Sequence, residues 1–145
     1  MINNVVFGFL GSRLDQGGPG DRWQTWRPTV ALGMHEEFLM RRFEIFHGPN
    51  ETQLLQTVVE DLGSVSPETE IRTHAMPLSD PWDFEEVYGK LHDFFKHYPF
   101  HPEAEEYFAN ITTGTHTEQI CCSCLPNHDI FPASSSKHRR LAASP

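Results

Sequence analysis

The chain has 145 residues, of which 38% are hydrophobic and 21% are charged, and its formal net charge is -9. This length fits one domain with a sizeable core, and the composition excludes a wholly disordered chain. The acidic balance argues against long nucleic acids as nonspecific partners, because the protein repels their phosphate backbone, whereas a short nucleotide or RNA end can still enter a local pocket.

Membrane insertion and secretion are not expected from this sequence. No apolar run is long enough to cross a bilayer, and the first residues lack the basic, apolar and small-residue segments of a signal peptide. We therefore expect a cytoplasmic protein with no membrane partner. Three cysteines gather at Cys121, Cys122 and Cys124, and their odd number in that compartment argues against a disulfide framework.

Strand-like apolar runs alternate with helical spacing of apolar residues along the chain. In chain order, we expect a strand at 5–10, a helix at 28–38, a strand at 42–46, a helix at 51–62, a strand at 70–75, a helix at 84–96, a strand at 105–111 and a helix that begins near 115. Pro28 suits the first position of the first helix, and Asn50 and Asp83 suit the caps of the next two. The apolar spacing of the third helix places Phe84 among its inward-facing side chains.

This alternation of strands and helices, with short connections, predicts an α/β fold in which helices cover a parallel sheet. In such sheets, ligands bind beyond the carboxyl ends of the strands. The loops at that edge are 8–27, the stretch after Phe46, 76–83 and 112–116.

The segment after the fourth expected strand reads Thr112-Thr113-Gly114-Thr115-His116 and leads into a helix. Small hydroxyl residues and glycine at a helix start are typical of an anion site, because free amides and the positive end of the helix dipole favour phosphate. The alternative is a tight strand-to-helix turn with threonine caps. His116 could donate to a terminal phosphate or lie solvated on the first helical turn.

Two further groups on the first loop are candidate ligand contacts. Gly8, Gly11 and Ser12 follow the first strand, where glycine permits close approach of a ligand; the alternative is packing within the sheet and turn. The second group is an aromatic and basic cluster, in which tryptophan could stack on bases and arginine could pair with phosphate. Its alternative is a loop pinned to the core by two large rings. The cluster consists of Arg22, Trp23, Trp26 and Arg27.

Other motifs receive a structural interpretation. We expect Pro81-Trp82-Asp83 to be a helix cap with an anchoring tryptophan. The histidine and cysteine residues near the C-terminus do not have the spacing of paired CxxC motifs, so no metal site is predicted. No cofactor is predicted either, because the first turn does not offer G-x-G-x-x-G.

Five segments in register resemble the N-terminal region of the RtcR family, sigma-54-dependent activators of the RNA 3'-terminal phosphate cyclase and RNA ligase operon. They are 5–11, 22–29, 65–70, 81–88 and 111–116. The resemblance covers 1–121 and implies a Rossmann-like sensor domain of the CARF type, a three-layer sandwich that binds an RNA terminus or an oligoadenylate-type ligand. It also implies a homo-oligomer in the intact regulator.

In the full family architecture, an AAA+ ATPase and a helix-turn-helix DNA-binding domain follow the sensor. This sequence contains no G-x-x-x-x-G-K-[ST] motif, so we expect neither ATP hydrolysis nor direct DNA binding by this chain. The function implied is a regulatory sensor. The alternative from another class is a metal-independent nuclease acting on the same ligand, with His116 and a threonine hydroxyl positioning the 2'-OH.

The resemblance stops soon after Ile120, where Pro126 would cost about 3 kcal/mol in an early helix interior. A shifted reading of permitted codons from Cys122 onward restores an apolar helix and a strand like the family's own continuation. We therefore expect 1–121 to be the sensing domain and 122–145 to be a frameshifted, non-native tail. The sheet would then be incomplete at its C-terminal end, and its unpaired edge would leave the chain marginally stable.

Overall fold

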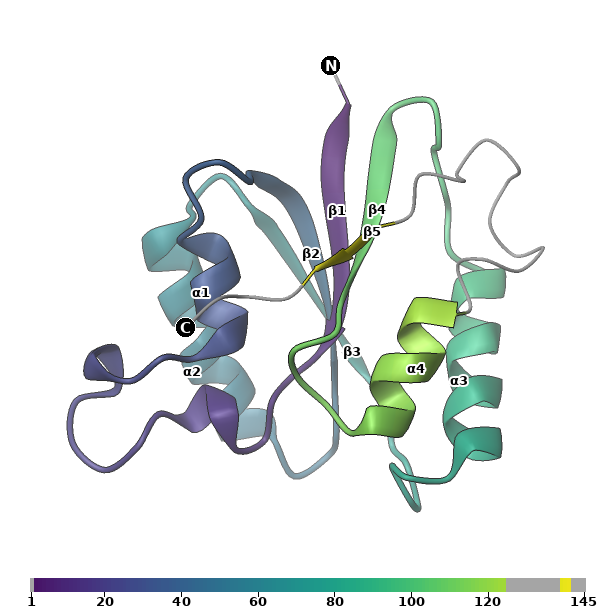
Figure 1. Ribbon diagram of the computed structural model, residues 1–145, viewed down its shortest axis with the longest axis horizontal. Coiled ribbons are helices and arrows are strands. Elements are labelled where there is room, and N and C mark those ends of the chain that lie inside the picture. Colours follow the sequence, from purple (N-terminus) through teal and green to yellow (C-terminus); the bar gives the residue numbers. More distant parts are fainter. Residues whose placement is uncertain (1, 125–138, 142–145) are drawn as a thin grey trace.

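The computed structural model describes residues 2–124 and 139–141, and it shows a parallel sheet between two layers of helices (Figure 1). The strands are β1 (Asn3–Phe9), β2 (Met40–His47), β3 (Glu70–Ala75), β4 (Glu105–Asn110) and β5 (Arg139–Leu141). The helices are α1 (Pro28–Gly33), α2 (Thr52–Val65), α3 (Phe84–Lys96) and α4 (His116–Cys124), with short 3-10 turns η1 (Leu14–Gln16) and η2 (Arg22–Gln24). The expected Rossmann-like α/β sandwich is confirmed.

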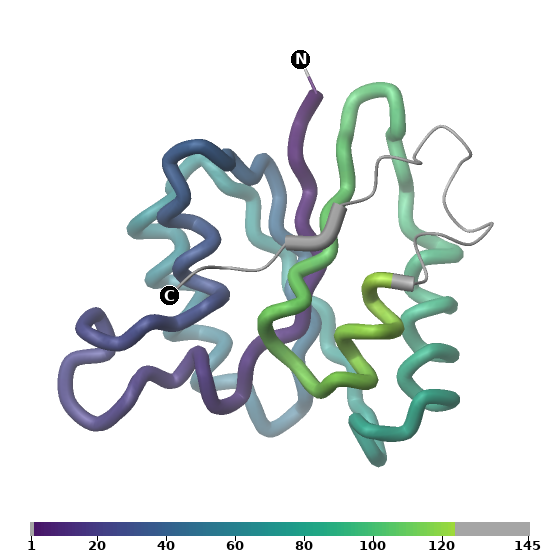
Figure 2. The backbone as a smooth tube through the Cα atoms, in the orientation of Figure 1, coloured from purple at the N-terminus to yellow at the C-terminus, as the bar shows by residue number. Residues whose placement is uncertain are grey.

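The sheet order is β3-β2-β1-β4-β5, and every pair is parallel. Helices α1 and α2 cover one face, while α3 and α4 cover the other, as the tube in Figure 2 also shows. Because all strands run the same way, the loops that follow them meet at one edge of the sheet.

The central strand β1 is buried on both faces, as its continuous apolar run predicts. Val5 and Phe7 pack in the cluster under α3 and α4, and Val6 packs in the cluster under α1 and α2. The side chains of Phe95 and Tyr98 meet the ring of Phe7 edge-on at centroid distances of 5.0 and 5.1 Å. Because successive side chains of β1 point to opposite faces of the sheet, this strand contributes to both clusters and joins them into one domain.

Helix boundaries follow the expected capping in part. Pro28 occupies the first turn of α1, and the side chain of Asp83 accepts a hydrogen bond from the amide of Glu85 at the start of α3. The expected cap at Asn50 is wrong, because the residue before α2 is Glu51. The first helix ends at Gly33 rather than near Phe38, with the next residues turning toward β2.

Phe84 is not inward-facing, and this expectation is also wrong. Its side chain is 52% exposed because it lies on the first turn of α3, and its ring stacks on that of Tyr88 at 5.6 Å. The inward positions of α3 are those of Val87, Leu91 and Phe95, which are all buried.

Strand β5 comes from the segment expected to be a non-native tail, and it pairs with the last three residues of β4, from Phe108 to Asn110. No strand was expected in this segment. Pairing covers only half of the six-residue strand β4, so the sheet remains incomplete on that side within the described residues. The rest of the expected tail, 125–138 and 142–145, lies outside the described residues.

One acidic side chain lies inside the sheet layer. Glu44 on β2 is fully buried, and its carboxylate binds the guanidinium of Arg42 at 2.8 Å and the ring of His74 at 2.7 Å. The hydroxyl of Tyr98 also donates to Glu44, and Arg42 extends the network to Glu105 on β4 at 2.6 Å. Although burial favours the neutral acid, these hydrogen bonds lower the pKa of Glu44 below its usual value. The network therefore joins the segment that follows α3 to strands β2, β3 and β4.

Candidate functional site

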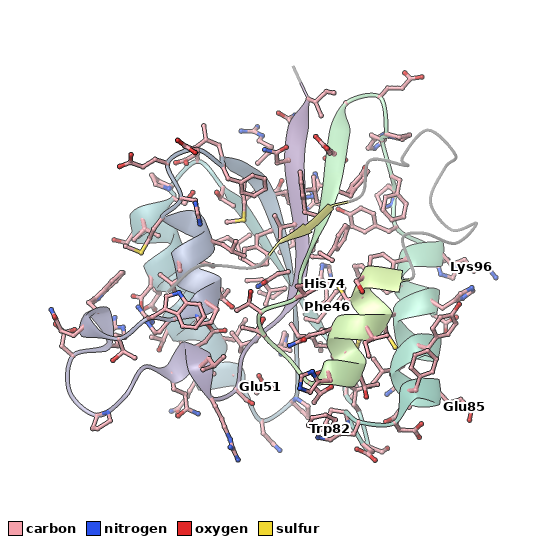
Figure 3. All side chains as sticks on the ribbon, in the orientation of Figure 1. Phe46, Glu51, His74, Trp82, Glu85 and Lys96 are labelled. Carbon is pink, nitrogen blue, oxygen red and sulfur yellow. The ribbon has the colours of Figure 1, made fainter. Side chains whose placement is uncertain are left out.

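A cleft of about 630 Å³ opens at the carboxyl edge of the sheet, where the loops after β1, β2, β3 and β4 meet. Figure 3 shows Glu51 and Trp82 at this same end of the molecule. The cleft is lined by 9–14 after β1, by 46–51 after β2, by Met76, Leu78, Pro81 and Trp82 after β3, and by 112–116 and Glu118 after β4. The four loops expected to meet at this edge therefore all contribute residues to the cleft.

The turns that follow β1 and β4 lie against each other. The hydroxyl of Thr113 donates to the backbone carbonyl of Phe9 at 2.5 Å. A Cβ atom on Gly11 would lie 2.9 Å from Cγ2 of Thr113, so only glycine allows this approach. The expected juxtaposition of the Gly11 turn with the threonine turn is thus present, and both turns line the cleft.

Gly114 gives the threonine turn its shape. Its φ is +89°, a left-handed conformation that side-chain-bearing residues rarely adopt. A Cβ here would also lie 3.1 Å from the Cβ of Phe9. Gly114 is exposed, and its amide has no hydrogen-bond acceptor among the described residues.

Thr115 acts as the helix cap that the alternative interpretation described. Its amide donates to Glu118 at 2.7 Å, while its hydroxyl accepts from the amide of Glu118 at 3.0 Å. This reciprocal pair is a capping box at the start of α4. The hydroxyl also donates to the carbonyl of Pro81 at 2.7 Å, so the polar groups of Thr115 are already engaged.

Carboxylates bind the amides of the other turns as well. Asp15 accepts from the amide of Gly11 at 2.7 Å and from the hydroxyl of Thr29 at 2.5 Å, and Glu51 accepts from the amide of Gly48 at 3.2 Å. Oε2 of Glu51 is buried without a hydrogen-bond partner in the described part of the chain. Burial raises the pKa of Asp15, Glu51 and Glu118 above their usual values.

The basic side chains at the cleft come from positions that sequence reasoning partly missed. Arg13 and His47 line it beside the expected His116. Arg13 is exposed, and none of the ion pairs among residues 2–124 includes it. Arg13 could have been predicted from the sequence, because it directly follows Ser12 in a turn that was expected at the binding edge.

The aromatic and basic cluster of the first loop does not reach the cleft. Arg22 and Arg27 both bind Asp61 on α2, at 2.7 and 2.8 Å, and Arg27 is only 3% exposed. The guanidinium of Arg27 also lies 5.0 Å from the ring of Trp23, while Trp26 packs against the core. The structure therefore favours a pinned loop, held by Trp26 and by the ion pairs to the nearly buried Asp61, whereas Trp23, the second expected anchor, is 42% exposed.

Gly8 was expected at the ligand site and does not line the cleft, whereas Trp82 was expected to be structural and does line it. Gly8 lies inside β1, where a Cβ would be 2.9 Å from the Cβ of Asn110, so it serves sheet packing and does not line the cleft. Trp82 does not anchor a cap, because it is 59% exposed at the rim of the cleft.

Comparison with known proteins decides the family. The model of a family described as "Regulator of RNA terminal phosphate cyclase" matches residues 2–139. The chain belongs to the RtcR family. It is 46% identical over 134 residues to the transcriptional regulatory protein RtcR of Escherichia coli strain K12, covering 92% of this chain. The chain spans a quarter of the length of that RtcR relative, 25%.

Solved structures support the fold assignment of this RtcR-family chain. Can2 from Sulfobacillus thermosulfidooxidans, solved in complex with cyclic tetra-adenylate, aligns with a TM-score of 0.63 and 14% identity over 98% of this chain and 32% of its own. Enterococcus italicus Csm6, bound to cyclic hexa-2'-fluoro-hexa-dAMP, aligns with a TM-score of 0.66 and 17% identity over 100% of this chain and 35% of its own. At these identities, the likeness establishes the fold alone.

Two negative findings apply to residues 2–124 and 139–141. None of the helices there combines the length and apolar character required to cross a bilayer. Histidine, cysteine and acidic side chains in the same ranges do not gather into a group of three suited to a metal ion.

Proposed function

We propose that this chain is the ligand-sensing part of a sigma-54-dependent regulator of RNA-repair genes, and that it binds the phosphate of an RNA end or an oligoadenylate in the cleft. The observation that carries the proposal is the contact between the Gly11 turn and the Thr113 turn, which lines one cleft with residues from both central strands. Parallel α/β sheets bind ligands where neighbouring strand ends meet.

The cleft combines the groups that a phosphate requires. Gly114 offers an exposed amide, Ser12 an exposed hydroxyl, and Arg13 and His116 cationic or donating side chains. Charge-assisted hydrogen bonds to phosphate are the strong ones in such sites. Two proteins with this fold were solved with cyclic oligoadenylates, which favours that ligand class here.

In the intact regulator, we propose that ligand binding shifts a conformational equilibrium that the downstream ATPase ring reads. The RtcR relative is about four times as long as the matched segment, which leaves room for such output domains. The intact regulator would be a homo-oligomer in the cytoplasm.

The geometry favours a sensor over a metal-independent nuclease. The hydroxyls of Thr113 and Thr115 already donate to the carbonyls of Phe9 and Pro81, so neither can donate a further hydrogen bond to a 2'-OH next to His116. The two functions differ in one observable: a nuclease turns the ligand over, whereas a sensor releases it unchanged.

The experiment is calorimetric titration of the chain with cyclic tetra-adenylate and with linear tetra-adenylate carrying a 3'-phosphate. We expect saturable binding without products by chromatography. Arg13→Ala should weaken binding about tenfold, because a charged hydrogen bond contributes about 1.5–3 kcal/mol. The matched control is Arg41→Ala on β2, which removes an equally exposed arginine that does not line the cleft. Failure of both adenylates to bind would sink the proposal, and product formation would replace it with the nuclease.

We also propose that 122–145 replaces the native continuation through a one-base frameshift near Cys122. The family match continues past residue 121 to residue 139, which counts against the frameshift, and the coding DNA is the test that decides it. Restoring one base should give an apolar helix and strand followed by an ATPase domain. A downstream sequence without that continuation would reject the frameshift.

A further inference from the structure

Trp82 is a large aromatic side chain placed in solvent at the rim of the cleft. Its exposed fraction is 59%, and it lies at the carboxyl edge of the sheet beside the start of α4 (Figure 3). An exposed ring at the rim of a cleft offers a large apolar face to a ligand. The side chain of Trp82 contributes little to the core and is available for such a contact.

The backbone that carries Trp82 is fastened to the threonine turn. The hydroxyl of Thr115 donates to the carbonyl of Pro81 at 2.7 Å, and the hydroxyl of Thr117 donates to the carbonyl of Trp82 at 3.0 Å. On the other side, the amide of Trp82 donates to the carboxylate of Asp80 at 2.9 Å. These bonds hold the position of the residue without using the indole ring.

The ring itself makes few contacts. Its aromatic neighbour among the described residues is His116, with ring centroids 6.1 Å apart and planes inclined by 46°. That separation and tilt leave no room for a base between the two rings, while Trp82 as a whole remains 59% exposed. His116 is the first residue of α4 and the last of the turn at 112–116. The indole of Trp82 therefore lies beside the turn that we propose binds the phosphate.

We propose that Trp82 is the base-stacking platform of the cleft: its indole stacks on the nucleobase whose phosphate is bound by the turn at 112–116. The inference rests on the proposed function, since it assigns the base of the same ligand. An indole face stacks on every nucleobase, so Trp82 supplies affinity with little discrimination between bases. Its rigid attachment to the threonine turn fixes the distance between base and phosphate contacts, which selects a nucleotide over a free phosphate.

The test compares binding of linear tetra-adenylate carrying a 3'-phosphate, cyclic tetra-adenylate and an abasic ribose-phosphate tetramer of equal charge. Trp82→Ala should weaken binding of the adenylates about tenfold and leave that of the abasic tetramer unchanged, as expected for loss of one stacked base. Trp82→Phe should retain most of the affinity because it keeps an aromatic face. The matched control is Trp23→Ala, which removes a 42% exposed tryptophan outside the cleft and should leave adenylate binding unchanged.

Tryptophan fluorescence gives a second readout. Adenylate should quench the unaltered chain and the Trp23→Ala variant, but Trp82→Ala should lose that quenching. Thermal unfolding of Trp82→Ala should match that of the unaltered chain, since the ring is exposed. Adenylate binding that is equally tight in Trp82→Ala, or equally weakened for the abasic tetramer, would overturn the stacking role alone. Absence of adenylate binding to the unaltered chain would overturn the proposed function and the stacking role together.

Discussion

The hydroxyl of Thr113 donates to the backbone carbonyl of Phe9 at 2.5 Å, across 104 positions of sequence. Thr113 is 2% exposed, so the carbonyl of Phe9 has little access to water if this bond is lost. The bond closes the contact between the ends of β1 and β4, and both residues line the cleft.

Thr113→Val should therefore destabilise the chain. The substitution keeps the branched shape but leaves a buried carbonyl unsatisfied, which costs about 1–3 kcal/mol. Urea denaturation followed by circular dichroism measures the change. The matched control is Thr73→Val on β3, where the side chain is exposed and the expected change is within about 0.5 kcal/mol. Equal stability of the two variants would show that the Thr113 bond is not closing the cleft.

Glu118→Gln should alter the pH dependence of stability. Burial raises the pKa of Glu118 in the folded state above its unfolded value of about 4.3, so the folded chain holds more protons in that window. The associated stability is present below the unfolded pKa and is lost as pH rises through the folded pKa. Glutamine still accepts the amide of Thr115 in the capping box but cannot ionise.

As the pH rises from 4 to 7, we expect the free energy of unfolding to fall less in Glu118→Gln than in the unaltered chain. The range begins near the reference pKa of glutamate and extends above it. Denaturation midpoints at several pH values provide the measurement. Glu85→Gln, at an exposed position on the first turn of α3 (Figure 3), is the control. If both variants follow the pH profile of the unaltered chain, Glu118 carries no such linkage.

Glu44→Gln should be among the most destabilising single substitutions. It leaves the charge of Arg42 partly uncompensated in a buried network, and breaking a buried pair costs about 3–5 kcal/mol. Because the pKa of Glu44 is lowered, its contribution is present above the unfolded pKa and is lost as pH falls through the folded pKa. The penalty measured by denaturation should thus be larger at pH 7 than in acid.

The control for the buried network is Glu70→Gln. Glu70 pairs with Arg72 at 2.9 Å, but both side chains are about half exposed, so the expected cost is below about 1 kcal/mol. Similar penalties for Glu44→Gln and Glu70→Gln would contradict the assignment of the network as a buried structural element.

Arg22→Ala tests whether the first loop lies outside the binding site. Arg22 pairs with Asp61 from a partly exposed position, so its loss should cost less than about 1 kcal/mol. Adenylate affinity should not change, in contrast to Arg13→Ala, because Arg22 lies outside the cleft. A tenfold loss of affinity in Arg22→Ala would restore the first loop to the binding site.

Hydrophobic periodicity and turn chemistry were sufficient to predict the parallel sheet, its two helical layers and the edge where the cleft lies. They act locally: the run from Val5 to Leu10, the proline of α1 and the Asp83 cap each impose their conformation within a few residues. Gly114 also acts locally, because glycine readily adopts the φ of +89° found at this turn.

Tertiary contacts decided which polar groups are free to bind a ligand. Sequence alone could not show that Asp61 engages Arg22 and Arg27, because the partners are separated by 39 and 34 positions. Nor could it show that Trp82 is fastened through its backbone and left exposed, since its anchors come from α4. Local patterns determine backbone conformation, whereas the availability of a charge or a ring depends on long-range neighbours that satisfy it, and these exist only once the sheet has formed.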